Sequence, residues 1–73
     1  MIDTEKFLAA MKEYGDTQSS LAEFLGVSRQ NVCQVLKGRQ GFTLSHVQKI
    51  SKRYSLTDSE IVDIFIFPYR KTQ

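Results

Sequence analysis

The chain has little of what several kinds of site require. One of its 73 residues is cysteine and one is histidine, so an internal disulfide is excluded and a metal site is not expected. The longest apolar run, Ile64–Pro68, is far too short to cross a bilayer. The acidic beginning of the chain does not resemble a signal peptide. A reducing, cytoplasmic setting with no membrane partner is therefore expected.

Catalytic residue patterns are also missing. The sequence has no Ser-His-Asp set, no paired catalytic carboxylates and no glycine-rich phosphate loop. A chain of this length forms a single domain, residues 1–73, whose thin core leaves little room for a deep active site. We therefore expect that the protein is not an enzyme and that it binds no cofactor, no metal ion and no small-molecule substrate.

Acidic residues are absent from the middle of the chain. No Asp or Glu occurs from Phe24 to Thr57. The net charge is −2 over residues 1–16, +5 over residues 17–56 and −1 over residues 57–73, although the total is only +2. A basic middle between mildly acidic ends favours contact with a polyanion.

What the sequence does contain is a series of clearly marked helices. Apolar residues recur at helical spacing, and strand-like alternation is almost absent. Five short helices are predicted, each preceded by a capping residue. These caps are Asp3, Thr17, Ser28, Thr43 and Thr57. Pro68 is expected to end the fifth helix. The predicted fold class is all-α.

The apolar positions of the helices predict which side chains face the core. They are Phe7, Leu8, Met11 and Tyr14 in the first helix, Leu21, Ala22 and Leu25 in the second, Val32, Val35 and Leu36 in the third, and Leu44, Val47, Ile50 and Tyr54 in the fourth. Phe24, Phe42 and Phe65 also occupy core spacings, which disfavours a surface that stacks single-stranded bases. His46 is expected on the exposed side of its helix.

The segment 18–37 carries the most specific pattern, that of two helices joined by a tight turn. Ala22 is small where the second of these helices crosses the first, and Gly26 suits a turn with a positive φ. Val27 fills the angle between the helices, and two valines of the following helix anchor it from below. The five offsets together predict a helix-turn-helix.

The outer face of the second helix in this motif carries side chains suited to base edges. Arginine pairs with guanine and glutamine with adenine in the major groove of double-stranded DNA. We expect base reading by Arg29, Gln30, Cys33 and Gln34. The alternatives are a solvated polar face, a phosphate contact for Arg29, and a redox role for Cys33 in place of contact with a thymine methyl group.

Residues around this face are expected to hold the phosphate backbone. Helix N-termini offer amide groups and a favourable dipole to an anion. The expected set is Gln18, Ser19, Ser28, Asn31, Lys37, Arg39 and Thr43. For Lys49, Lys52 and Arg53, late in the fourth helix, a structural role at the helix dipole is favoured over a phosphate contact.

From Thr17 to about Phe67 the chain resembles the lambda-repressor-like Cro/XRE family of helix-turn-helix proteins, in particular small phage-encoded Cro-like regulators. The motif and the Phe42-Thr43 step into the fourth helix carry the resemblance. It implies a compact five-helix domain whose third helix reads operator DNA, a phosphate contact by Gln18, and a homodimer. The residues before Gln18 depart slightly from the family opening and place Asp16 beside that contact.

The C-terminal segment is richer in apolar residues than one thin core absorbs, and such an excess usually marks a partner surface. We expect dimerisation through the segment 57–69, with contacts from Ile61, Ile64, Phe65, Ile66 and Phe67. A symmetric dimer binds half-sites about 34 Å apart. The alternatives are an extended arm over Ile66–Tyr69 that pairs with its twin, and a tail folded over the monomer's own core.

Together these features predict a sequence-specific transcription regulator that binds double-stranded DNA. The specific hypothesis is a bacteriophage repressor of the Cro type, acting in the cytoplasm of a bacterial host in association with the nucleoid. The alternative is a protein-interaction module, a repressor modulator or antirepressor, that uses the same fold to bind a partner repressor.

Overall fold

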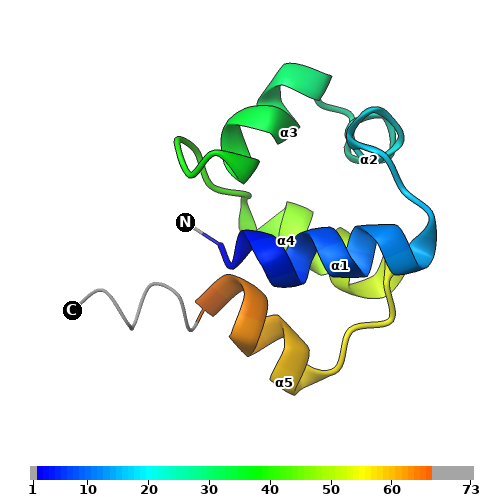
Figure 1. Ribbon diagram of the computed structural model, residues 1–73, viewed down its shortest axis with the longest axis vertical. Helices are drawn as coiled ribbons and strands as arrows, with labels where there is room; N and C mark the ends of the chain where they lie inside the picture. The colour runs from blue at the N-terminus through cyan, green and yellow to red at the C-terminus, as the bar shows by residue number, and fades with distance from the viewer. Residues whose placement is uncertain (1, 67–73) are drawn as a thin grey trace.

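Five α-helices and a final π-helical turn form the part of the chain that the computed structural model describes, residues 2–66 (Figure 1). They are α1 (Thr4–Tyr14), α2 (Gln18–Leu25), α3 (Arg29–Leu36), α4 (Leu44–Arg53), α5 (Asp58–Ile61) and the turn η1 (Val62–Ile66). Over residues 2–66 there is no strand, which confirms the all-α prediction. None of the described helices has the length and apolar character needed to span a bilayer.

Each helix begins after the capping residue that the sequence predicts. The side-chain oxygens of Asp3, Thr17, Ser28, Thr43 and Thr57 accept a hydrogen bond from the backbone N–H three residues further on. At α5 the Glu60 carboxylate accepts the Thr57 N–H in return at 2.9 Å, which completes a capping box. These bonds join residues close in sequence, so the sequence is sufficient to locate the helix starts.

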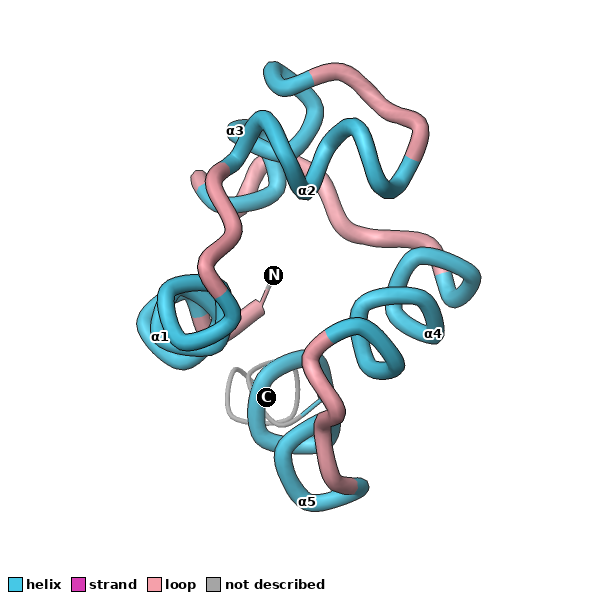
Figure 2. Tube along the Cα trace, turned by 90° about the vertical axis from the view of Figure 1, so that its right-hand side faces the viewer, coloured by secondary structure: helices cyan, strands magenta, loops and turns pink. Residues whose placement is uncertain are grey.

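One hydrophobic core lies between the helices. The pair α2 and α3 forms one end of the molecule, α5 forms the other, and α1 and α4 lie between them (Figure 1, Figure 2). Phe7 is fully buried, and its ring centroid is 5.7 Å from that of Phe42, 6.3 Å from that of Tyr54 and 6.0 Å from that of Phe65. The buried core consists of Ile2, Phe7, Met11, Leu21, Ala22, Leu25, Val32, Val35, Ile50, Ile64 and Phe65.

Two leucines expected in the core are exposed instead. Leu8 lies outside because Phe7 and Met11, four residues apart, form the centre of the buried stripe of α1. Leu44 is 75% exposed. It is the first residue of α4, at the edge of the apolar face whose buried residue is Ile50. Helical spacing places residues on a face, but packing decides how far along the helix that face is covered.

His46 is expected on the surface but is half-buried. Its ring meets that of Phe42 edge-on, with the centroids 6.0 Å apart. Its Nδ1 is buried and has no hydrogen-bond partner within the described part of the chain. The expectation fails because Phe42, just before the helix, packs against the core beside the first turn of α4.

The end of α5 continues as a π-helical turn that packs into the core. Ile64 and Phe65 are only 4% and 7% exposed, and the Ile64 carbonyl accepts the Asp3 N–H at 2.8 Å. These two side chains, expected at a dimer contact, therefore pack on the monomer's own core. Ile66 is 45% exposed. The expected contact at Phe67, the helix stop at Pro68 and the rest of the segment to Tyr69 lie outside the described residues.

Candidate nucleic-acid interface

The turn between α2 and α3 has the geometry that its sequence predicts. Gly26 has a φ of +73°, a left-handed conformation that glycine adopts without strain. The Val27 N–H donates to the Ala22 carbonyl at 3.0 Å, and the Val27 side chain packs against the core. With Ala22 buried between them, α2 and α3 pack directly against each other. Residues 18–37 therefore form a helix-turn-helix.

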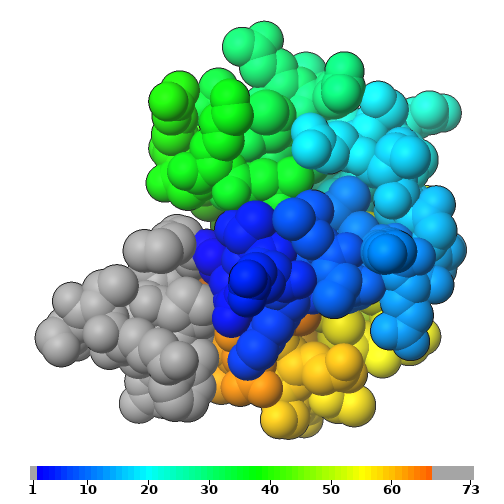
Figure 3. Space-filling view, in the orientation of Figure 1, coloured from blue at the N-terminus to red at the C-terminus, as the bar shows by residue number. Residues whose placement is uncertain are grey.

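The side of α3 that faces away from the core carries the four side chains expected to read bases. Buried valines on the opposite side fix the rotation of the helix. Gln18, the first residue of α2, joins Arg29, Gln30 and Cys33 around one shallow hollow. Figure 3 shows α2 and α3 forming one continuous end of the molecule. Arg29 and Gln30 are exposed, and Cys33 and Gln34 are half-buried.

The residues expected to hold phosphates lie in α2 and α3 and in the segments that flank these helices. They are Gln18 and Ser19 in the first turn of α2, Ser28 before α3, Asn31 within it, Lys37 and Arg39 after it, and Thr43 before α4. The hydroxyl oxygens of Ser28 and Thr43 accept the backbone N–H of Asn31 at 3.0 Å and of His46 at 3.2 Å. Their hydroxyl protons take no part in these bonds, so both groups retain a donor.

Asn31 also makes a contact that the sequence does not reveal. Its Nδ2 donates to Gln40 Oε1 at 3.0 Å, which holds the connection between α3 and α4 back against α3. Arg39 lies in that connection, next to Gln40. At the other end of the same helix, the Thr4 hydroxyl donates to the Leu36 carbonyl at 3.2 Å. Both bonds position α3 and the segment that follows it.

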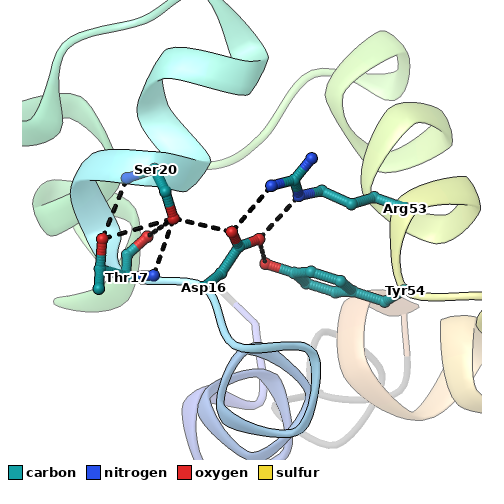
Figure 4. A network of polar contacts seen from close by, with 5 residues as sticks. All are labelled: Asp16, Thr17, Ser20, Arg53 and Tyr54. Carbon is teal, nitrogen blue, oxygen red and sulfur yellow. Dashed lines mark hydrogen bonds and ion pairs between the residues drawn. The ribbon is translucent and has the colours of Figure 1, made fainter.

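The strongest electrostatic feature is a buried carboxylate at the beginning of α2. The Asp16 side chain is 3% exposed and accepts hydrogen bonds from Arg53 Nε at 2.8 Å and Arg53 Nη2 at 2.9 Å (Figure 4). It also accepts from Tyr54 Oη and Ser20 Oγ, each at 2.7 Å. The Arg53 bonds hold the pKa of the Asp16 carboxyl well below its usual range, although burial opposes this shift. Burial, and then the bond to Asp16, raise the pKa of Tyr54 above its usual range.

Arg53 is held by aromatic rings as well as by Asp16. Its guanidinium carbon lies 4.7 Å from the centroid of the Tyr14 ring and 4.4 Å from that of Phe24. The sequence predicts these two rings in the core. They are exposed instead, and each lies against the Arg53 guanidinium. Arg53 therefore has the structural role that was favoured for it, through Asp16 rather than through the helix dipole alone. No sequence pattern indicates this pair, whose members are 37 residues apart.

Comparison with known proteins assigns the fold to a family. A family model described as helix-turn-helix matches residues 8–61, which include the whole α2–α3 motif. Searches of curated proteins and of solved structures give no match. The family match confirms both the resemblance to Cro/XRE proteins and the lambda-repressor-like fold. The chain therefore belongs to the Cro/C1-type helix-turn-helix family and is a regulator that binds double-stranded DNA.

Proposed function

We propose that the chain is a phage repressor of the Cro type that reads operator DNA at the nucleoid of a bacterial host, with α3 in the major groove. The outer face of α3 carries this proposal, because it is polar, free of acidic residues and adjacent to Gln18. In this arrangement Arg29, Gln30 and Gln34 meet base edges, and Cys33 meets a thymine methyl group.

The surrounding residues hold the DNA backbone in this proposal, which sets the register of the helix without reading sequence. Gln18, Ser19, Ser28, Lys37, Arg39 and Thr43 contact phosphates. Asn31 contacts a phosphate as well, because its Nδ2 carries two hydrogens and the bond to Gln40 uses one of them. This bond keeps Arg39 beside α3, where a phosphate flanking the groove is within reach.

Replacing Gln34 by alanine is expected to weaken operator binding by about 1–3 kcal/mol, since a pair to a base edge is lost. Non-specific binding depends on phosphate contacts and should hardly change. The affinity is measured by titrating the protein against two duplexes at several salt concentrations. One duplex comes from upstream of the gene that encodes this protein, and the other has a random sequence. Ser59→Ala on α5, at the opposite end of the fold (Figure 1), is the control. Equal losses on both duplexes would refute base reading by Gln34.

We further propose that the repressor is a homodimer that pairs through a groove between α4 and α5. The groove is lined by Leu44, Val47, Gln48, Ser51, Lys52, Leu56 and Ile61. Of the residues expected at a dimer contact, Ile61 lies in this groove, whereas two others are buried in the core. In this dimer the second copy covers Leu44, which is 75% exposed in the single chain and lies beside the apolar groove residues Val47 and Leu56. The basic Lys52 on α4 and the acidic Asp58 on α5 offer opposite charges to a second copy.

Leu44→Glu is expected to weaken the dimer by about 2 kcal/mol or more, because a buried leucine is lost and a charge is placed in the contact. The fold should persist, since an acidic residue is favourable in the first turn of a helix. Sedimentation of the free protein over a range of concentrations measures the effect. Ile66→Glu adds the same charge at another exposed apolar position, one that the sequence also favoured as a dimer contact, and in this proposal it should leave the dimer intact. Dissociation by Ile66→Glu alone would instead place the contact at the C-terminal end.

The same groove also supports the alternative function, in which it binds a partner repressor. The wild-type chain distinguishes the two functions. A repressor binds its duplex without any other protein, whereas a modulator affects that duplex only when the partner repressor is present.

A further inference from the structure

The Asp16 network lies next to the proposed phosphate path. Asp16 immediately precedes Thr17, the cap of α2, and its Oδ1 is 2.7 Å from Ser20 Oγ in the first turn of that helix. Gln18 lies between these residues in the chain. A nearly fully buried carboxylate therefore lies at the helix end that is proposed to receive a phosphate.

An uncompensated carboxylate at this place would oppose DNA binding. The positive end of a helix dipole and its free amide groups attract an anion, and a fixed negative charge beside them repels it. Such charges interact more strongly at a partly buried site than in bulk water. Arg53 supplies the compensating charge from the last turn of α4, through its two bonds to the carboxylate.

We propose that Arg53 is a positioning residue for DNA binding, which joins α4 to the start of α2 and neutralises Asp16 so that a backbone phosphate can approach. This inference rests on the proposed DNA-binding surface. The bonds to Asp16 and the rings of Tyr14 and Phe24 fix the guanidinium in place. Its charge is thereby directed to the carboxylate rather than to the duplex.

A pair with a purely structural role predicts a different result. Loss of either partner would then lower the free energy of unfolding, and the DNA affinity of the molecules that remain folded would be unchanged. In our proposal the two losses have opposite effects on that affinity. Removal of Arg53 leaves a negative charge beside the phosphate, and removal of the Asp16 charge leaves a positive one.

The test compares Arg53→Gln, Asp16→Asn and the double variant with the wild type. Arg53→Gln keeps the donors of Tyr54 and Ser20 for the carboxylate. Lys6→Gln, at an exposed position of α1, removes one positive charge elsewhere and controls for net charge. Affinity for one random duplex is measured at low and high salt. It is corrected for the folded fraction, which is obtained by circular dichroism at the same temperature.

Arg53→Gln should bind about tenfold more weakly than the wild type at low salt, since one like charge faces the phosphate at short range. Asp16→Asn should bind at least as tightly as the wild type, and the double variant should be close to it. Lys6→Gln should lose less affinity for the duplex than Arg53→Gln does. All differences should shrink at high salt because the charges are screened.

Equal losses in Arg53→Gln and Asp16→Asn, or a double variant as weak as Arg53→Gln, would overturn the inference. A wild-type chain that binds no duplex would instead refute the proposed function. If Arg53→Gln does not fold, the remaining variants decide. Asp16→Asn must not weaken binding per folded molecule, and Arg53→Lys, which keeps the charge, must retain most of the wild-type affinity.

Discussion

Replacing Phe7 by alanine is expected to remove a large part of the domain's free energy of unfolding. Phe7 is fully buried and contacts three aromatic rings, those of Phe42, Tyr54 and Phe65. These rings come from the connection before α4, the end of α4 and η1, so one side chain joins α1 to the whole second half of the fold. A cavity of this kind costs about 3–5 kcal/mol. The total stability of a chain of this length is only about 4–11 kcal/mol.

Urea denaturation followed by far-ultraviolet circular dichroism measures this loss. Leu8→Ala is the matched control, because Leu8 is the exposed neighbour of Phe7 on the same helix. Its cost should be below about 1 kcal/mol, as for most substitutions at exposed positions. Equal shifts of the two denaturation midpoints would contradict the central place of Phe7 in the core.

The second large effect is expected at the buried ion pair, where Asp16→Asn should cost about 3 kcal/mol at neutral pH. The substitution leaves Arg53 without its charged partner and weakens two charge-assisted hydrogen bonds. It should also make stability less sensitive to acid. The folded state lowers the pKa of Asp16 below the value of about 3.9 that it has in an unfolded chain.

The sign of the pH effect follows from this lowered pKa. In acid the unfolded chain binds a proton at Asp16 that the folded chain does not bind. The stabilisation is therefore complete above about pH 4 and decreases as the pH falls towards the folded pKa. Urea midpoints between about pH 7 and pH 2.5 should fall less steeply in Asp16→Asn than in the wild type. The control is Glu13→Gln, at an exposed carboxylate, whose urea midpoints should change with pH as those of the wild type do. If the midpoints of Asp16→Asn fall in acid as steeply as those of the wild type, the lowered pKa of Asp16 is contradicted.

The sequence by itself determined the features that depend on neighbouring residues. Capping bonds span three residues, so Asp3, Thr17 and Thr57 mark the helix starts without any knowledge of the rest of the fold. The turn at Gly26 depends on a local φ that few residues other than glycine adopt. The helix-turn-helix and the outer face of α3 were predictable for the same reason, since helical geometry converts spacing into direction.

Only the tertiary structure decided which groups from distant parts of the chain meet. Asp16 pairs with Arg53, which is 37 residues away, and Asn31 donates to Gln40 in the irregular connection after α3. Packing of the helices brings these groups within hydrogen-bond range. Packing likewise buries Ile64 and leaves Leu44 exposed, although both are apolar residues at helical spacing. Periodicity specifies the direction of a side chain from its own helix. Whether another element covers that side chain depends on how the helices pack, which no local pattern records.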